Sequence, residues 1–288
     1  MSTDNLLAGG IDLHTHSGPS LYDRALDDFG LAAEAKEAGM RAVVLKNHEC
    51  PTAGRAAIVN TRVEGVVACG GIVLNQFIGG FNPFAVDAAL KMGGKIVWFP
   101  TFHARNHIAH YGSDSPALTE HQLEAPRVGL SVLDETGRLQ PEVEPVLQKI
   151  AAGKAILGTG HLSAGEILVL TDAALAAGVE KILITHADMG FVGLTMDDQV
   201  RLAKKGAVLE KCYLAMLIAQ DGGGKAMAES IQAIGAEHCV LVTDLGQAVL
   251  PHPVDGMQSF VETLMAEGVS REETRVMLAE NPARLLGL

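Results

Sequence analysis

At 288 residues the chain is longer than the commonest domain, but single α/β barrels reach this length. Its formal net charge of −12 at pH 7 argues against nucleic acids and anionic membranes as partners. The four cysteines form no CxxC pair, no basic and apolar leader is visible, and no apolar run approaches the roughly 18 residues of a membrane span, so we expect a cytoplasmic protein.

Short apolar runs alternate with amphipathic stretches along the chain, and this predicts alternating strands and helices. The predicted strands are Gly10–His14, Arg41–Lys46, Val66–Leu74, Lys95–Phe99, Ala155–Thr159, Lys181–Thr185, Gly206–Tyr213 and Cys239–Thr243. Helices are expected at about 27–38, 52–61, 83–93 and 225–234, from 163 and from 195, and finally at 254–266 and from 270. Asn82 before Pro83, and Ser163 three residues before Glu166, are typical helix starts.

The alternation is interrupted once, after the fourth strand. Residues 101–140 show little periodicity, and two short apolar runs around Asp134–Gly137 indicate a hairpin there. Long connections inside a compact domain are commonly functional. We expect a lid-like insertion over the mouth of the fold.

Eight strands that are almost continuously apolar, each followed by a helix, predict a (β/α)8 TIM barrel formed by one domain over residues 1–288. An open doubly wound sheet is the alternative architecture.

Metal-competent or ionisable side chains lie at the ends of five of the predicted strands. They are His14 and His16, Lys46 and His48, His161, His186, and Asp244. In a barrel the carboxyl ends of the strands carry the chemistry. Imidazole is a common ligand of zinc-like ions, and a carboxylate after the apolar strand Cys239–Thr243 is costly unless it is paired. The pattern predicts a divalent-metal site.

Four segments carry a family resemblance: Ile11–His16, Gly160–Ser163, Ile184–Asp188 and Val242–Asp244. Their order, H-x-H on the first strand, His on the fifth and sixth and Asp on the eighth, resembles the amidohydrolase superfamily. The segments Leu45–His48, Gly71–Asn75 and Thr243–Gln247 resemble its DUF6282 branch more closely.

The resemblance implies a metal-dependent hydrolase with metal-activated water. The implied metal ligands are His14, His16, Lys46, His161, His186 and Asp244, and the implied catalytic residues are Asp244, His186 and Lys46. Asp244 would move the proton, and His186 would be a ligand or would polarise the scissile carbonyl. One or two ions are implied, Zn2+ first, with Mn2+, Fe2+ or Ni2+ as alternatives.

Lys46 differs from the family pattern, because bridging ligands are common on the fourth strand and this lysine follows the second. It could be carboxylated and bridge two metals. It could instead be a free ammonium that binds a substrate carboxylate, or a surface residue with a solvated head.

Substrate contacts are expected from residues beside the predicted strand ends, namely His48, Asn75, His103, Arg105 and Gln247. The expected substrate is a small molecule, and a homo-oligomer is left open.

The leading hypothesis is a hydrolase of an amide, cyclic amide, ester or lactone bond. The alternatives are a metal-dependent decarboxylase of the same superfamily, a phosphoesterase, and a non-catalytic binding protein on the same fold.

Overall fold

The computed structural model describes residues 5–112, 129–219 and 222–288. Its strands are β1 (Ile11–His16), β2 (Ala42–Lys46), β3 (Val67–Val73), β4 (Ile96–Trp98), β5 (Ile156–Gly158), β6 (Lys181–Ile184), β7 (Val208–Cys212) and β8 (Cys239–Val242). Each lies within or beside its predicted range. β1 is displaced most, because its pairing with β2 continues to the pair His16 and Lys46.

The helices follow the strands. They are α1 (Asp28–Glu37), α2 (Ala53–Asn60), α3 (Pro83–Lys91), α4 (Arg105–Tyr111), α6 (Val143–Ala152), α7 (Ala164–Ala176), α8 (Met196–Lys204), α9 (Tyr213–Ile218), α10 (Gly223–Ile234), α11 (Pro253–Ala266), α12 (Arg271–Arg275) and α13 (Asn281–Leu286). Shorter turns form η1 (Gln76–Ile78), η2 (Ala236–His238) and the π-helical turn η3 (Val276–Glu280).

The predicted helix starts are confirmed. Asn82 accepts hydrogen bonds from the backbone N–H groups of Phe84 and Ala85, with Pro83 at the first helical position. Ser163 and Glu166 form a capping box at the start of α7. These contacts satisfy backbone donors that have no partner within the helix.

The strands form one eight-stranded sheet in the order β1-β2-β3-β4-β5-β6-β7-β8, and the registered pairs are parallel. A parallel sheet in chain order, with helices between the strands, is a (β/α)8 barrel. The predicted fold class is therefore confirmed. The doubly wound alternative is excluded, because its strand order reverses at a switch point.

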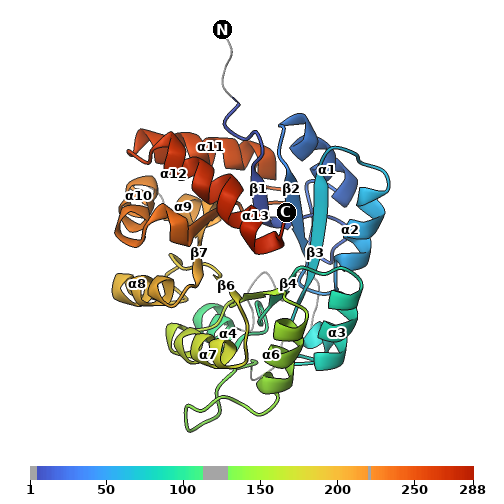
Figure 1. Cartoon of the computed structure of the whole chain (residues 1–288), viewed down its shortest axis with the longest axis vertical. Coiled ribbons are helices and arrows are strands. Elements are labelled where there is room, and N and C mark those ends of the chain that lie inside the picture. The colour runs from blue at the N-terminus through green and yellow to red at the C-terminus, as the bar shows by residue number, and fades with distance from the viewer. Residues whose placement is uncertain (1–4, 113–128, 220–221) are drawn as a thin grey trace. The chain divides into compact units, whose positions relative to one another are not determined.

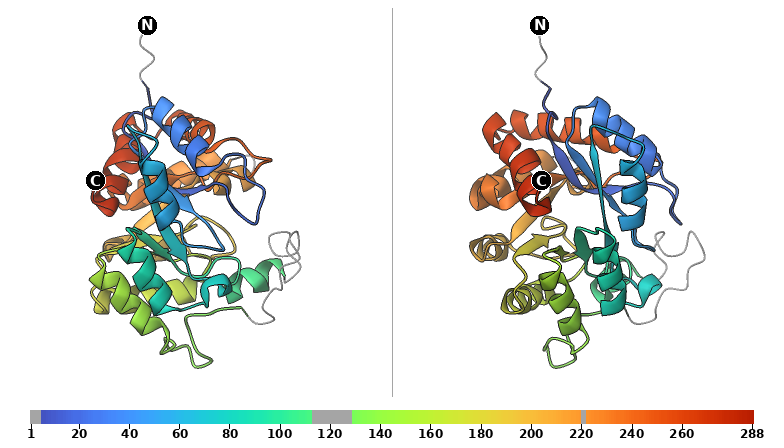
Figure 2. Two further views of the ribbon diagram at one scale, coloured as in Figure 1. Left: turned by 90° about the vertical axis from the view of Figure 1, so that its right-hand side faces the viewer. Right: turned by 45° about the vertical axis from the view of Figure 1, so that its right-hand side comes forward.

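The residues group into two compact units. Unit 1 comprises Met1–Lys46, Gly54–Gly70 and Glu210–Leu288, and unit 2 comprises Asn47–Ala53 and Gly71–Leu209. In unit 1, α13 packs against β1 and β8, and α11 packs against α1 and α10 (Figures 1 and 2). In unit 2, α3 packs against α6, and α7 packs against α8 and β6 (Figure 1). The single domain over residues 1–288 stays a prediction.

The stretch after β4 is only partly described. Residues 113–128 of the predicted insertion lie outside the described residues. Before them, α4 is a helix that the periodicity did not predict. After them, Leu133 and Leu139 form an antiparallel bridge, which agrees with the predicted hairpin. The lid function of this insertion stays a prediction.

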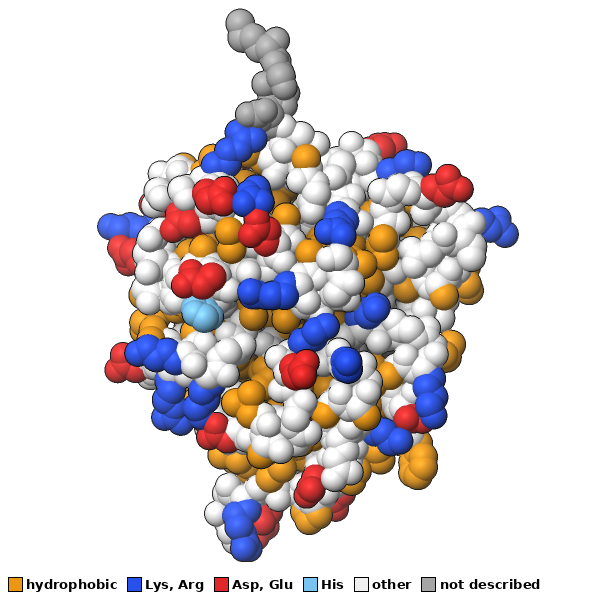
Figure 3. All heavy atoms as spheres, viewed as in Figure 1, with side chains coloured by type: hydrophobic (Ala, Val, Ile, Leu, Met, Phe, Trp, Pro, Cys, Tyr) orange, Lys and Arg blue, Asp and Glu red, His pale blue; other side chains and the backbone are white. Residues whose placement is uncertain are grey.

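Acidic and basic side chains are interspersed on the face shown in Figure 3, although acidic residues are in excess over the whole chain. Over the described part of the chain, no helix combines the length and apolarity needed to cross a membrane.

Candidate metal centre

His14 and His16 lie on β1, whose six residues are all buried. The side chain of His14 is wholly inaccessible and that of His16 is 1 % exposed. The β1–β2 register shifts between Asp12 and Thr15. Such a bulge redirects side chains and is common beside functional sites.

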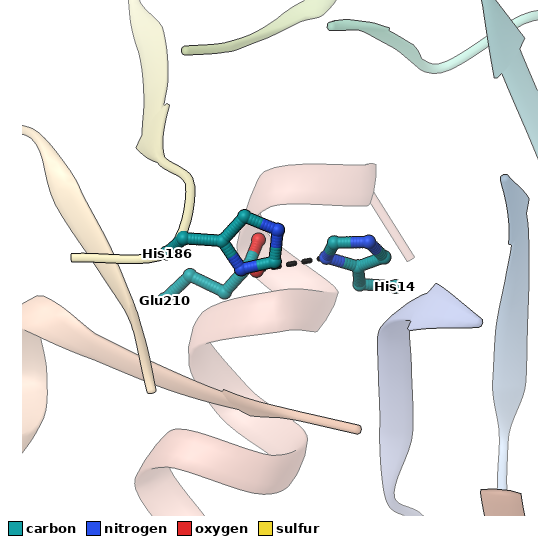
Figure 4. A group of neighbouring side chains, drawn as sticks. All are labelled: His14, His186 and Glu210. Carbon is teal, nitrogen blue, oxygen red and sulfur yellow. Dashed lines mark hydrogen bonds and ion pairs between the residues drawn. The ribbon is translucent and has the colours of Figure 1, made fainter. Parts of the chain in front are cut away.

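The Nδ1 atoms of both histidines are held by acceptors. His14 Nδ1 lies 2.8 Å from Oε1 of Glu210 on β7 (Figure 4). His16 Nδ1 lies 3.0 Å from the backbone oxygen of Lys46. A carbonyl oxygen and a carboxylate only accept, so each Nδ1 carries a proton and donates. In the neutral rings the lone pair is therefore on Nε2, the atom left for a metal.

Both Nε2 atoms converge on one carboxylate oxygen. Oδ1 of Asp244 lies 2.8 Å from His14 Nε2 and 2.9 Å from His16 Nε2. Asp244 directly follows β8 and has a left-handed backbone with φ of 56°. Such a conformation costs energy in a non-glycine residue and often occurs at functional sites.

His14, His16 and Asp244 each offer one ligand atom, and these atoms lie within 4.8 Å of one another. Two imidazole nitrogens and a carboxylate oxygen are a donor set that suits zinc and similar divalent ions. This group could therefore hold a metal ion.

The electrostatics of the two imidazoles differ. Burial disfavours charge on His14, but the carboxylates of Asp244 and Glu210 outweigh it and raise its pKa to about 9. Burial lowers the pKa of His16 well below its usual value, and Arg24 adds to that effect. The carboxylates therefore favour positive charge at His14, whereas burial disfavours it at His16.

Lys46 lies inside this group. Its side chain is almost fully buried at 1 % exposure, and Nζ lies 2.8 Å from His14 Nε2. Burial lowers the pKa of its amine. The interpretation of Lys46 as a solvated surface residue is therefore wrong, because β2 is buried along its whole length.

Two buried acidic residues of this region were not predicted from the sequence. Glu210 lies in the middle of β7 and holds His14. Asp12 accepts a 2.6 Å hydrogen bond from the Thr243 hydroxyl, and burial raises its pKa to about 7. The available signal was an acidic residue within an apolar strand, which requires a partner when it is buried.

His161 and His186 lie in unit 2 after β5 and β6, and their ring centroids are 5.1 Å apart. His161 Nδ1 lies 3.0 Å from Nδ1 of His107 on α4, so one ring donates to the other. His186 shares with Asp244 a left-handed backbone with φ of 56°. Their function as metal ligands stays a prediction.

Three of the predicted substrate residues lie together in unit 2. The Asn75 amide donates to the backbone oxygen of His48 at 3.0 Å and to the Thr101 hydroxyl at 2.8 Å, and its oxygen accepts from Thr101 N at 2.9 Å. His103 follows in the same loop and is buried.

The other two predicted substrate residues lie elsewhere. Arg105 begins α4 and is exposed. Gln247 belongs to unit 1, where its amide donates to the backbone oxygen of Asp244 at 3.0 Å.

Comparison of the sequence with curated proteins gives no match. Solved structures match over almost the whole chain. An amidohydrolase from Pseudomonas aeruginosa has a TM-score of 0.65 at 11 % identity, covering 98 % of this chain and 96 % of that one. The N-acetyl-D-glucosamine-6-phosphate deacetylase from Mycobacterium smegmatis has a TM-score of 0.58 at 16 % identity, covering 98 % and 76 %. The 2,6-dihydroxybenzoate decarboxylase from Rhizobium has a TM-score of 0.54 at 14 % identity, covering 97 % and 99 %.

These structural likenesses establish the shared fold. The model of a protein family matches residues 9–210, which include β1 to β6 and the start of β7. The chain therefore belongs to DUF6282, a family of unknown function.

Proposed function

We propose that this protein is a metal-dependent hydrolase of the amidohydrolase type, acting on an amide, cyclic amide, ester or lactone bond of a small molecule. The convergence of His14 Nε2 and His16 Nε2 on Asp244 Oδ1 carries the proposal. The similar solved structures include an amidohydrolase and a deacetylase, which supports the same class.

The donor set fits a divalent ion. Glu210 and the Lys46 carbonyl hold the Nδ1 protons, so each imidazole can offer Nε2 as a ligand. We propose His14, His16 and Asp244 as ligands of Zn2+, with Mn2+, Fe2+ or Ni2+ as alternatives. His161, His186 and a carboxylated Lys46 remain predicted further ligands, and the state of Lys46 would decide between one ion and two.

When bound, the ion would polarise the scissile carbonyl and lower the pKa of a water molecule. Asp244 would accept the proton of the attacking water and pass it to the leaving nitrogen or oxygen. Glu210 would hold the His14 ring in its orientation. The buried Lys46 amine would balance the charge of Asp244 and Glu210.

A metal-dependent decarboxylase is the second candidate. Lys46 Nζ contacts His14 Nε2 directly at 2.8 Å, the distance expected for an amine donor. If Lys46 is not carboxylated, its buried amine would bind the carboxylate of a substrate. The decarboxylase among the similar structures supports this second candidate.

Metal analysis tests the centre. Purified protein kept in zinc should contain close to one or two equivalents, and His14→Ala or His16→Ala should lose most of the metal. His238→Ala, in the turn η2, is the matched control and should retain it. If wild-type protein contains no metal under conditions that retain zinc, the proposal is wrong.

Turnover then separates the two reactions. The metal-loaded enzyme would be screened against amides, lactones and aromatic carboxylic acids, with product analysis that distinguishes hydrolysis from CO2 release. Asp244→Asn should lower the rate by about 10² to 10⁴, since it removes the proton acceptor. An unchanged rate would exclude Asp244 from proton transfer.

The cytoplasmic location, the absence of nucleic-acid and membrane partners, and the oligomeric state stay predictions.

A further inference from the structure

His103 has a defined tautomer. Its Nδ1 lies 3.0 Å from the backbone nitrogen of Gln76, at the start of η1. A backbone N–H only donates, so Nδ1 accepts, and the neutral ring must carry its proton on Nε2. This is the opposite arrangement to His14 and His16, whose Nδ1 atoms donate. The Nε2 atom of His103 is therefore a hydrogen-bond donor, whereas the Nε2 atoms of His14 and His16 can be metal ligands.

The Nε2 atom of His103 is buried and has no hydrogen-bond partner among the residues that the structure describes. A buried donor without an acceptor is energetically costly, so such a group calls for a functional explanation. Burial lowers the pKa of the ring to about 4, which keeps His103 neutral at pH 7. The donor is thus an uncharged N–H group.

A second imidazole of unit 2 has a polar partner on Nδ1. His48 Nδ1 lies 2.9 Å from the Thr101 hydroxyl, whose oxygen already accepts from Asn75. Either group can donate in this contact, so it holds the ring of His48 without fixing which nitrogen carries the proton. Asn75 holds the loop of His48 and the loop of Thr101 together, because its oxygen also accepts from the backbone N–H of Thr101. It is a positioning residue.

Aromatic rings adjoin these imidazoles. Phe102 stacks on His48 with centroids 4.0 Å apart, and Phe77 lies 4.6 Å from His103. Both phenylalanines are only partly buried. Flat, partly exposed rings favour contact with a flat apolar ligand.

We propose that His103 Nε2–H is a substrate-binding donor for a carbonyl-type oxygen, and that the substrate is a planar unsaturated or aromatic molecule carrying that oxygen. The proposal rests on the proposed function, whose substrate class it narrows. The oxygen could belong to a carboxylate or to an uncharged amide or lactone. No proton is transferred, because the donor keeps its hydrogen.

Two substitutions separate the donor from the structural contact. In His103→Asn the side-chain oxygen can still accept from Gln76 N, but no group reaches the position of Nε2. In His103→Gln the longer amide places an N–H near that position. Full-length, zinc-loaded protein would be titrated with benzoate, benzamide and cyclohexanecarboxylate by calorimetry.

We expect His103→Asn to weaken benzoate or benzamide binding about tenfold, as the loss of one hydrogen bond implies. His103→Gln should restore most of the affinity, and cyclohexanecarboxylate should bind more weakly than benzoate. Tighter binding of benzoate than of benzamide would identify the accepting group of the substrate as a carboxylate. Tighter binding of benzamide would identify it as an uncharged carbonyl. Equal binding by wild type and His103→Asn, or no binding of either aromatic probe to wild type, would overturn the proposal.

A direct measurement covers the case in which the variants fold poorly. Histidine labelled with 15N in the wild-type protein should give, for His103, an Nε2–H signal that moves on addition of the bound probe. An Nδ1–H tautomer, or an Nε2 signal that the probe leaves in place, would refute the assignment. Metal content measured on the same wild-type samples tests the proposed function separately: if wild type with full metal content binds neither aromatic probe, only the donor proposal is defeated.

Discussion

Glu210 Oε1 lies 2.8 Å from His14 Nδ1, and both side chains are completely buried. The two residues are 196 positions apart in the chain, on β7 and β1. The carboxylate fixes the tautomer of His14 and increases the basicity of the nitrogen offered to a metal. It is therefore part of the candidate centre without being a predicted ligand.

Glu210→Gln should weaken zinc binding by about 10- to 100-fold, since the neutral amide removes the negative charge behind His14. Competition with a chromophoric chelator measures the affinity, and circular dichroism checks the fold. Glu229→Gln, on the exposed face of α10, serves as the control and should leave the affinity unchanged. Zinc affinity in Glu210→Gln equal to that of wild type would show that the contact has no effect on the metal.

Removal of the metal should lower the melting temperature. An ion at about 100 times its dissociation constant stabilises the folded state by about 2.7 kcal/mol, which corresponds to roughly 5–10 °C in a protein of this size. Differential scanning calorimetry with and without a chelator measures the shift. The chelator should have little effect on the double variant His14→Ala/His16→Ala. An equal shift in both proteins would mean that the metal is bound elsewhere.

Gly246→Ala should destabilise unit 1 strongly. Gly246 has φ of 133°, and a Cβ atom there would lie 1.8 Å from the backbone oxygen of His16. Because the clash is with backbone, we expect a loss of at least about 3 kcal/mol in the free energy of unfolding, with loss of metal. Urea denaturation and metal analysis measure both quantities.

Gly178→Ala is the matched control for that substitution. Gly178 has φ of 84°, but a Cβ atom added there would meet no atom of the surrounding described residues within 4 Å. The substitution should cost only the backbone strain of about 1–2 kcal/mol. A similar loss in both variants would mean that the approach of Gly246 to β1 does not matter.

Acid should destabilise the protein through the buried histidines of unit 2. Burial lowers the pKa of His103 and of His107 to about 4, against 6.5 for the ordinary side chain. Between these two pH values the unfolded chain therefore binds more protons than the folded protein. The contribution of these two histidines to the free energy of unfolding is complete above pH 6.5 and is lost as the pH falls to 4.

Each of these groups contributes a slope of up to about 1.4 kcal/mol per pH unit in that window. Urea unfolding at several pH values measures it. His103→Asn should make the slope shallower. An unchanged slope in His103→Asn would mean that its ring is not neutral in the folded protein.

The sequence by itself determined the barrel and the strand ends that carry the chemistry. Apolar strand runs and amphipathic helices are local patterns, so β1 to β8 could be recognised without tertiary information. His14, His16 and Asp244 could be predicted because polar residues at the carboxyl ends of apolar strands are costly unless they have a function there. The short helix α4 gave no comparable periodic signal.

Only the tertiary structure decided which nitrogen each histidine presents. That choice depends on the atom facing Nδ1: Glu210 for His14, the Lys46 carbonyl for His16, and Gln76 N for His103. These partners lie far away in sequence, and no local pattern encodes them. The burial of Lys46 was settled in the same way, because it depends on how β2 is covered and not on the residues beside it.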